Sequence, residues 1–277
     1  MNQKIYNITL PTPLLCHGAR PREEAELRIP SIRGLLRLWH QILWGKQDAD
    51  FCWGCVSQNS QKEGAAACAS KVAMRLLENN LPTASEINML PHHKMPVRAK
   101  GYGISERSFS VAVSFRYLPD NEKKQQLIEH VEKTIKLWLL LGTFGQRETR
   151  AFGSVWTKDF SSLSSDAYCD EVNSLLRGAN QPYAVQLLEP AANDIKTATE
   201  LLSCCSDTIG GKPDLFGGIR PRKVSPLKMK IVKLSGRYYV VLHASDHSII
   251  ENAMKVLHSN SKPLATKFNV IRKLGRQ

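Results

Sequence analysis

The stretch Glu26–Trp44 reads ELRIPSIRGLLRLWHQILW and predicts an amphipathic helix with two distinct sides. We expect this helix to begin after Pro30, with Ser31 as the residue that caps its N-terminus. Apolar residues recur at the three- and four-residue spacing of a core-facing stripe. They are Ile32, Leu35, Leu36, Trp39, Ile42 and Leu43, and a second stripe of Arg33, Arg37, His40 and Trp44 repeats on the other side. The spacing indicates one side for a hydrophobic core and one side for a polyanion.

The residues around this helix predict an α+β domain with the element order βαββαβ. Alternating polarity predicts strands over 4–10, 71–77 and 108–117. A long helical pattern covers 121–141, and a further strand is expected at 155–158. Residues 79–105, rich in Pro, Asn, His and Gly, are expected to form an irregular insertion. The order is that of the ferredoxin-like fold.

The second half of the chain repeats this pattern less clearly. Its expected elements are a strand at 183–188, a helix at 194–203, strands at 224–234 and 237–243 that turn at 235–236, and a helix at 247–258. We therefore predict two tandem ferredoxin-like (RRM-like) folds with insertions. They cover residues 1–160 and 161–277, with the boundary in the Ser-rich stretch 159–172.

The charge of the chain favours a polyanionic partner. Lys and Arg outnumber Asp and Glu by 38 to 25, which gives a formal charge of +13. Residues 158–211 hold three basic against eight acidic side chains, whereas residues 212–277 hold fourteen against three. Two basic regions that flank an acidic one indicate that both ends of the chain bind one ligand, with nucleic acid as the first candidate. A generally basic surface is the alternative.

Cysteine use and hydropathy predict a cytoplasmic protein. Seven cysteines is an odd number for a disulfide framework, and the N-terminus lacks the pattern of a signal peptide. The longest uninterrupted apolar run, Leu137–Leu141, is far shorter than the roughly 20 residues that a membrane span needs. We expect a reducing compartment, no transmembrane segment and no membrane partner.

The segment 142–155, GTFGQRETRAFGSV, has the residue types of a phosphate-binding loop. Its glycines permit positive φ and close approach of the backbone, and Arg147 and Arg150 can contact phosphate through two hydrogen bonds each. Phe144 and Phe152 either stack on bases or belong to the core, and the core is favoured. The loop follows a helix and has no Gly-Lys-Ser/Thr ending, which argues against nucleotide hydrolysis.

Three parts of the chain resemble a known family. They are the Thr12-Pro13-Leu14 strand exit with Gly18, the pattern Arg-x-Pro-Ser-x-Arg-Gly-x-x-Arg-x-Trp over 28–39, and the Gly-rich loop that ends at Phe152-Gly153-Ser154. Together they resemble the RAMP superfamily of CRISPR-associated proteins. The pattern over 28–39 is most similar to the first RAMP subunit of the type III-B Cmr effector complex. Arg222, Ser225 and Pro226 resemble that family's Arg-x-x-Ser-Pro element.

The resemblance implies a non-catalytic subunit of a ribonucleoprotein. Its partners would be the guide RNA (crRNA), near the 3′ region, with target RNA as an open further ligand, and neighbouring RAMP subunits. It also implies the two ferredoxin-like folds. No cofactor is predicted.

The predicted RNA-binding residues form three groups. Ser31, Arg33, Gly34 and Arg37 make one wall, with His40 one turn further along the helix, and Gly145, Arg147, Arg150 and Gly153 make another. Arg220, Arg222 and Lys223 extend the site. Exposed amides at the start of the Ser31 helix are expected to bind phosphate, because a helix N-terminus favours negative charge.

Two other functions stay open at this point. A guide-processing, metal-independent ribonuclease would use His17 or His40 as a proton shuttle, and a protein adaptor would bind an acidic partner through the basic face. The pair Cys52 and Cys55, with Cys68 and the distant His92-His93, is a weak signal for zinc. Buried free thiols are expected instead, and no metal site is predicted.

Overall fold

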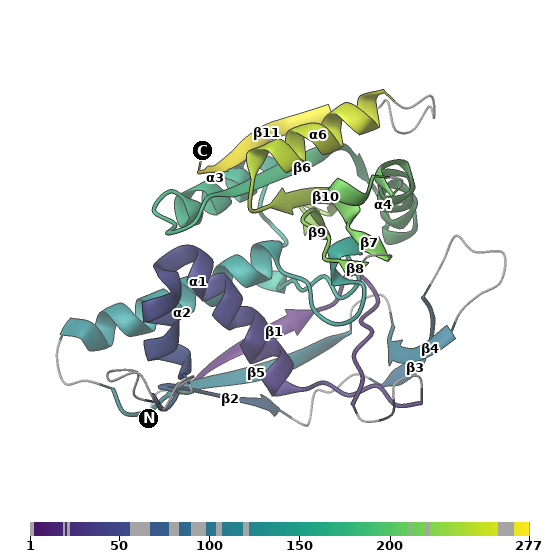
Figure 1. The fold of residues 1–277 in the computed structure, drawn as a ribbon. Coiled ribbons are helices and arrows are strands. Elements are labelled where there is room, and N and C mark those ends of the chain that lie inside the picture. The colour runs from purple at the N-terminus through teal and green to yellow at the C-terminus, as the bar shows by residue number, and fades with distance from the viewer. Residues whose placement is uncertain are drawn as a thin grey trace.

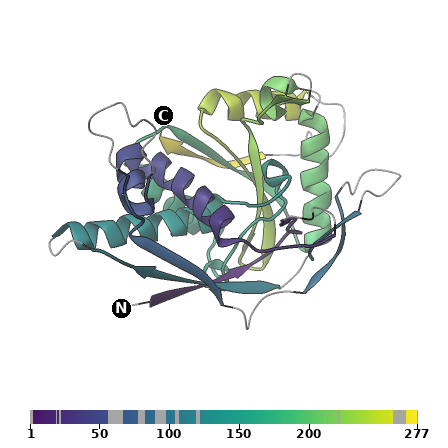
Figure 2. The ribbon, with the colours of Figure 1, turned by 60° about the horizontal axis from the view of Figure 1, so that its bottom comes forward.

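In the computed structural model, the two larger antiparallel sheets and two pairs of helices, α1 (Ile29–Trp53) with α2 (Glu122–Leu141) and α4 (Ile195–Ile209) with α6 (His247–His258), alternate in four layers (Figure 1). The structure describes residues 3–18, 20, 23–55, 67–77, 83–89, 98–103, 107–118, 122–210, 212–219, 222–259 and 269–276. The first sheet lies at one side of the molecule, and helices α1 and α2 lie between it and the second sheet. Helices α4 and α6 cover the outer face of the second sheet (Figure 2).

The first sheet confirms three predicted strands. Its order is β1-β5-β2, with β1 at Gln3–Thr9, β5 at Ser108–Phe115 and β2 at Val72–Leu77. The strand expected at 155–158 is reduced to a bridge beside β1, in which Thr9 and Trp156 exchange backbone hydrogen bonds of 2.7 and 2.9 Å. The chain order up to this bridge is therefore β, α, β, an insertion, β, α and a fourth, very short extended segment.

The insertion contains regular structure that the sequence did not predict. Strands β3 (Ala84–Asn88) and β4 (Arg98–Tyr102) form an antiparallel hairpin. Tyr102 exchanges backbone hydrogen bonds of 2.9 and 3.0 Å with Leu14, which ties the hairpin to the strand exit after β1. Short polar strands of this kind give a weak alternation signal, so composition alone suggested a loop.

The second sheet has the order β11-β6-β10-β9. Its strands are β6 (Tyr183–Ala192), β9 (Lys228–Leu234), β10 (Arg237–Ala244) and β11 (Asn269–Arg276). Along the chain, β6, α4, β9, β10, α6 and β11 follow one another in the order βαββαβ. Helix α3 (Ser165–Leu176) precedes them, and a small unit of α5 (Pro213–Phe216), β7 (Gly218–Ile219) and β8 (Arg222–Lys223) lies between α4 and β9. Helix α3, β11 and this small unit were not predicted.

The two halves of the chain share one hydrophobic core. The ring of Trp39, on α1, lies 5.3 Å from the ring of Tyr183 on β6 and 5.9 Å from that of His243 on β10. This core continues into the first sheet and into α3. A second cluster fills the space between the outer face of the second sheet and helices α4 and α6. The second sheet is therefore covered on both faces, by α1, α2 and α3 on one and by α4 and α6 on the other.

Helix α1 differs from its prediction at both ends. Its N-cap is Arg28, not Ser31, and the helix continues to Trp53 instead of ending near Trp44. Gly45 interrupts it with φ 86° and ψ 170°, a conformation that side chains rarely adopt, so the helix is sharply bent there. The predicted apolar stripe is confirmed: each of its six residues is buried or half-buried.

Lys230 joins the two halves through a buried hydrogen-bond network. This β9 side chain is 0% exposed, and its ammonium group donates to the carbonyl oxygens of Leu139, Gly142 and Val155 at 2.8, 2.7 and 2.6 Å. The first two carbonyls belong to the end of α2, where carbonyl groups lack helical partners and the helix dipole favours a cation. Lys230 therefore caps α2 and fixes the loop after it.

No helix within the described residues has the length and hydropathy needed to cross a membrane.

Candidate nucleic-acid interface

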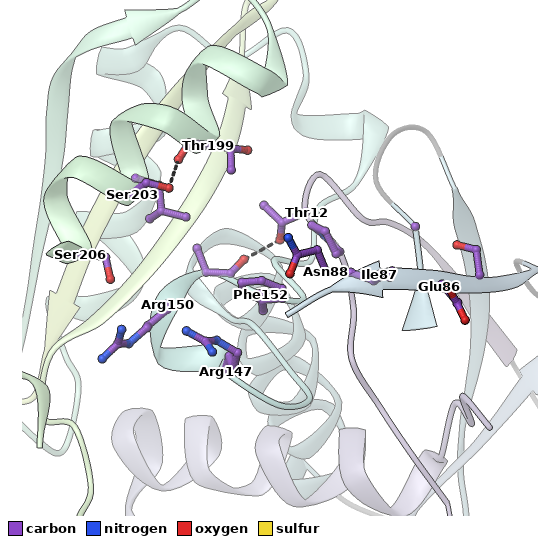
Figure 3. Close-up of a pocket in the computed structure, with 15 residues that line it drawn as sticks. Thr12, Glu86, Ile87, Asn88, Arg147, Arg150, Phe152, Thr199, Ser203 and Ser206 are labelled. Atoms are coloured by element: carbon purple, nitrogen blue, oxygen red, sulfur yellow. Dashed lines mark hydrogen bonds between the residues drawn. The ribbon is translucent and has the colours of Figure 1, made fainter. Parts of the chain in front are cut away.

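A pocket of about 410 Å³ lies between the two halves of the chain, next to the Gly-rich loop (Figure 3). The loop contributes Arg147, Arg150 and Phe152 to its lining. Strand β3 lines a second side, and α4 lines a third with hydroxyl side chains. The volume is in the range of small-ligand sites, and three separate segments converge on it.

The Gly-rich loop is held in place by the segment that follows β1. The amide of Gly153 donates to the carbonyl of Pro13 at 2.7 Å, and that of Gln146 donates to Leu15 at 2.6 Å. The hydroxyl of Thr12 donates to the carbonyl of Ala151 and accepts from the amide of Ser154 at 2.9 Å. The strand exit and the loop, more than 130 residues apart in sequence, thus form one rigid element.

The loop glycines are required by the protein's own packing. Gly145 has φ 95°, and an added Cβ would lie 2.5 Å from the carbonyl oxygen of Leu15. Gly153 has φ 63°, and its added Cβ would lie 2.0 Å from the carbonyl oxygen of Phe144. Both distances are shorter than real contacts, so the chain itself explains why these positions are glycine. They shape the loop, while neither of them lines the pocket.

The two loop arginines lie in the pocket wall without acidic partners. Arg147 has the left-handed conformation (φ 59°), and its guanidinium lies 5.6 Å from the ring centre of Phe152. The guanidinium of Arg150 lies 4.9 Å from the ring of Phe216. Neither arginine forms an ion pair with a carboxylate in the described part of the chain. The Nε atom of Arg147 is buried and has no hydrogen-bond partner there.

Within the described part of the chain, no carboxylate forms an ion pair with either of these arginines. Burial, and then the charge of Arg150, lower the pKa of Arg147 below its ordinary value. Burial raises the pKa of the neighbouring Glu148, while the charge of Lys228 opposes that rise. Glu86 also lines the pocket, but its carboxylate accepts from Arg98 at 3.2 Å. The pocket therefore presents two positive groups that an anion would stabilise.

The predicted helix wall lines a different hollow, of about 450 Å³. Arg33 donates to the carbonyl of Trp53, and Arg37 donates to the carbonyl of Gly54 at 2.8 Å and to the carboxylate of Asp50. Both arginines are half-buried and fasten the start of the bent helix to its end. No residue lines both hollows, so the predicted walls do not form one pocket.

Two parts of the helix prediction are wrong. The amide of Ser31 donates to the carbonyl of Arg28 at 3.1 Å, and Pro30 has no amide hydrogen, so the helix start does not offer the expected set of free amides. Ser31 itself is exposed. His40 is 0% exposed and bonds Asp48 at 2.8 Å and Thr134 at 3.0 Å, so it is not on an RNA-facing side.

A family model places the chain among known proteins. The model described as RAMP superfamily matches residues 7–156, which is more than half of the chain. The chain belongs to the RAMP superfamily. The matched range contains α1, the Gly-rich loop and the strand exit that holds it.

Solved structures extend the likeness of this RAMP chain to its second half. Cmr1 from Pyrococcus furiosus, in a crystal structure of the apo form, superimposes with a TM-score of 0.55 at 15% identity, covering 98% of this chain and 94% of that one. A chain of the type III-B Cmr-beta complex bound to cognate target RNA gives 0.55 at 10% identity, covering 91% and 98%. The same complex with AMPPnP and ssDNA gives 0.54 at 11% identity, covering 91% and 98%. At these identities the likeness establishes the fold. None of the curated proteins matches the chain.

Sequence reasoning missed several pocket residues of this RAMP protein. Thr199, Ser203 and Ser206 recur at i, i+4 and i+7 on α4, and all three line the pocket (Figure 3). That polar stripe was visible as helical spacing, but a short polar stripe ordinarily indicates a solvated face. Phe216 does not line the pocket, but its ring lies 4.9 Å from the guanidinium of Arg150. It gave no signal in the sequence, because this contact joins residues far apart in the chain.

The third predicted group of RNA-binding residues, Arg220, Arg222 and Lys223, lies partly outside the described residues. Lys223 is exposed on β8, and Arg222 occupies the other position of this two-residue strand. Arg220 lies outside the described residues. The same small unit contains Phe216, whose ring lies against Arg150, so it adjoins the Gly-rich loop. Ser225 donates to the carbonyl of Leu227 at 2.6 Å, which gives it a structural role.

The packing of this RAMP fold does not explain why residue 34 is glycine. Gly34 lies exposed within α1, and an added Cβ would meet nothing within 4 Å. We expect Gly34→Ala to raise the free energy of unfolding by about 0.5–1 kcal/mol, because alanine is the better helix former. We also expect it to weaken RNA binding, since the space above the backbone is then reduced. Urea denaturation and fluorescence anisotropy with labelled RNA measure the two effects.

Gly178→Ala is the matched control, because its added Cβ also meets nothing within 4 Å. It should leave RNA affinity unchanged. If Gly34→Ala is more stable yet binds RNA as the wild type does, Gly34 is not at an RNA contact.

Proposed function

We propose that this RAMP protein is a non-catalytic RNA-binding subunit of a type III-B Cmr ribonucleoprotein in antiviral defence. It would bind the guide RNA near its 3′ region, contribute to target RNA capture and contact a neighbouring RAMP subunit. The observation that carries the proposal is the pair of unneutralised guanidinium groups, Arg147 and Arg150, in the wall of the pocket between the halves. The formal charge of +13 and the fold shared with chains of RNA-bound Cmr complexes support it.

The finer architecture in this proposal is a tandem of two ferredoxin-like units. The order β11-β6-β10-β9, joined through α4 and α6, agrees with such a unit in the second half. In the first half, β1-β5-β2 together with the bridge of Thr9 to Trp156 corresponds to the same arrangement with a shortened last strand. The pocket then lies where the two units meet.

The chemistry of the pocket suits a ribose-phosphate strand. A guanidinium group donates two parallel hydrogen bonds to a phosphate and keeps its charge at any physiological pH. The half-buried Phe152 ring beside Arg147 offers a face on which a base can stack. Such contacts hold the backbone and read little sequence. We therefore propose binding that depends strongly on salt and weakly on sequence.

The proposal assigns no catalytic role to the chain. A metal-independent ribonuclease needs a general acid or base within reach of a 2′-hydroxyl. The ring of His40, one candidate, is fully buried, and its two nitrogens contact Asp48 and Thr134. The other candidate is His17, whose Nδ1 atom forms a hydrogen bond of 3.1 Å with the carbonyl oxygen of Glu24. These contacts favour the binding function over the ribonuclease alternative.

Salt-dependent RNA binding tests the proposal directly. Fluorescence anisotropy with labelled single-stranded RNA should show Kd rising roughly 15- to 60-fold between about 50 and 200 mM salt, because three or four phosphate contacts each release counterions. The RNA recovered from the same samples, without added metal, should be intact on a gel.

Either of two results contradicts the proposal. A Kd that does not change with salt would exclude phosphate binding as the main interaction. Specific cleavage that disappears in His17→Ala would restore the ribonuclease alternative.

A further inference from the structure

Three side chains that the proposed function does not use converge between α1 and α2. The Nε2 atom of His40 and the Nδ1 atom of His130 each lie 2.8 Å from the same carboxylate oxygen, Oδ2 of Asp48. All three ligand atoms lie within 4.8 Å of one another. Two imidazoles and one carboxylate are a common donor set for transition metal ions in proteins.

The bend in α1 builds this cluster. His40 precedes Gly45 and Asp48 follows it, so the non-helical conformation of that glycine turns the later segment back toward the earlier one. Helix α2 supplies His130, whose ring is stacked on Trp44 at 3.8 Å with an interplanar angle of 2°. The indole of Trp44 also donates to the carbonyl of His130 at 3.2 Å. The position and plane of His130 are therefore defined by its surroundings.

Thr134 provides a suitable outer contact for His40. Its hydroxyl lies 3.0 Å from Nδ1 of His40 and 2.7 Å from the carbonyl oxygen of His130. When the hydroxyl donates to that carbonyl, its oxygen accepts from Nδ1–H of His40. In the metal-free protein Nε2–H donates to Asp48 at 2.8 Å, and a bound ion would take the place of that proton while Nδ1–H keeps its contact with Thr134. Histidine ligands in metal sites generally have such a partner on their second nitrogen.

Cys52 lies next to this cluster, and a turn of its side chain toward the ion would add a fourth donor. It lies one helical turn after Asp48, it is fully buried, and its Sγ atom is 3.9 Å from the same Oδ2. Asp48 has a side chain that is 31% exposed, which leaves a route for an ion to enter. Sequence reasoning grouped Cys52 with Cys55 and Cys68, whereas the structure places its thiol beside Asp48. The thiol lies outside the group of His40, Asp48 and His130, whose ligand atoms all lie within 4.8 Å of one another.

We propose that His40, Asp48, His130 and Cys52 bind one divalent transition metal ion of the zinc class, and that this ion holds the bent helix α1 on α2. In tetrahedral zinc sites, nitrogen and oxygen ligands lie about 3.3 Å apart. The 2.8 Å contacts therefore need to widen by only about half an ångström. The mixed nitrogen, oxygen and sulfur set selects zinc, or cobalt as its spectroscopic substitute, over calcium and magnesium.

Metal titration of the full-length protein tests the site. Protein stripped with a chelator and returned to metal-free buffer should bind one equivalent of Zn²⁺ in competition with a chromogenic chelator. Its Tm should rise by roughly 5–10 °C when free zinc is 100-fold above Kd. Co²⁺ should give the visible absorption of a four-coordinate site and a thiolate charge-transfer band that Cys52→Ser removes.

Variants separate this site from chance binding. Asp48→Asn and His130→Gln keep the size of the side chains and should weaken zinc binding by about 100-fold or more, beyond the 10- to 100-fold typical of outer contacts. The exposed His258→Gln should bind as the wild type does. If a variant fails to fold, the Co²⁺ spectrum of the wild type still shows whether a four-coordinate site is present.

Three results would overturn the proposal. One is binding of an adventitious ion only. In that case zinc binding would be lost in His258→Gln and kept in Asp48→Asn. Another is the absence of stoichiometric binding, which would leave the cluster as a hydrogen-bonded clamp. A cobalt spectrum without the thiolate band would remove Cys52 from the assignment.

Discussion

Lys230→Met should lower the free energy of unfolding by about 3–5 kcal/mol, the largest effect on stability that we expect from a single substitution here. The ammonium group satisfies three carbonyls, those of Leu139, Gly142 and Val155, in a site with no solvent access. Methionine has a similar length but no donor, so each carbonyl loses a partner at about 1–3 kcal/mol.

Part of that loss is offset by the cost of burying a charge. Burial lowers the pKa of Lys230 well below its ordinary value, so the wild type already gives up solvation to hold the group inside. The three carbonyls oppose this shift, because a neutral amine has only two N–H groups and cannot donate to all of them. The expected effect is therefore smaller than the sum of three lost hydrogen bonds.

Urea denaturation, followed by tryptophan fluorescence and circular dichroism, measures the effect. Lys233→Met is the matched control, because Lys233 lies on the same strand and is only half-buried. It should change stability by no more than about 0.5 kcal/mol. If Lys230→Met is as stable as this control, the three hydrogen bonds do not stabilise the fold beyond the cost of burial.

Arg147→Gln combined with Arg150→Gln should weaken RNA binding by roughly 100-fold, the largest functional effect that we expect. The double variant removes both unneutralised charges from the pocket wall and leaves the loop backbone, which Thr12 and Pro13 hold, unchanged. The slope of log affinity against log salt should become shallower by about 1.4, which corresponds to two phosphate contacts on a single strand. Anisotropy titrations at several salt concentrations give both numbers.

The same variant should fold normally. The charge of Arg150 contributes to the lowered pKa of Arg147, so the two groups repel one another, and removing them does not break an ion pair among the described residues. Arg177→Gln combined with Arg237→Gln, both exposed positions away from the pocket, is the control for net charge. If both double variants bind RNA equally well, the pocket is not the RNA site.

Local pattern predicted much of the fold. The alternation of 108–115 and the helical spacing of 122–141 gave elements within a few residues of the observed ones. Helix α6 has the predicted bounds because Asp246 caps its start and accepts from the amide of Ser248 at 2.8 Å. Such signals lie within a few residues of the element they define, so one sequence is enough to read them.

Features that depend on distant contacts could not be predicted in this way. Arg33 and Arg37 form the expected polar stripe, but their donors are used by carbonyls 17 to 20 residues further along the chain. Lys230 follows the alternation of an ordinary strand, and its burial depends on the end of α2, about 90 residues earlier. His40 is buried because Gly45 bends the helix, and a glycine in a helical pattern does not by itself reveal a bend.

The sequence indicated the residue types of the candidate site better than it indicated their arrangement in space. Arg147 and Arg150, predicted as RNA-binding residues from the basic Gly-rich loop, both line the pocket, and their contact with RNA stays a prediction. The glycines beside them serve the packing of the loop, and the helix start offers few amides. Which residues share one pocket depends on how the halves meet, and that arrangement is set by contacts such as Trp39 with Tyr183.

The core shared by the two sheets has a consequence for protein engineering and for evolution. Residues 1–160 expressed alone would present the apolar side of α1, including Trp39, to water, together with an uncapped end of α2. A chimera that takes one half from a related chain would have to inherit matching partners for Trp39 and for the α2 carbonyls. Substitutions at Tyr183 and Lys230 should therefore be inherited together with changes in the first half, and the two halves should diverge as a single unit.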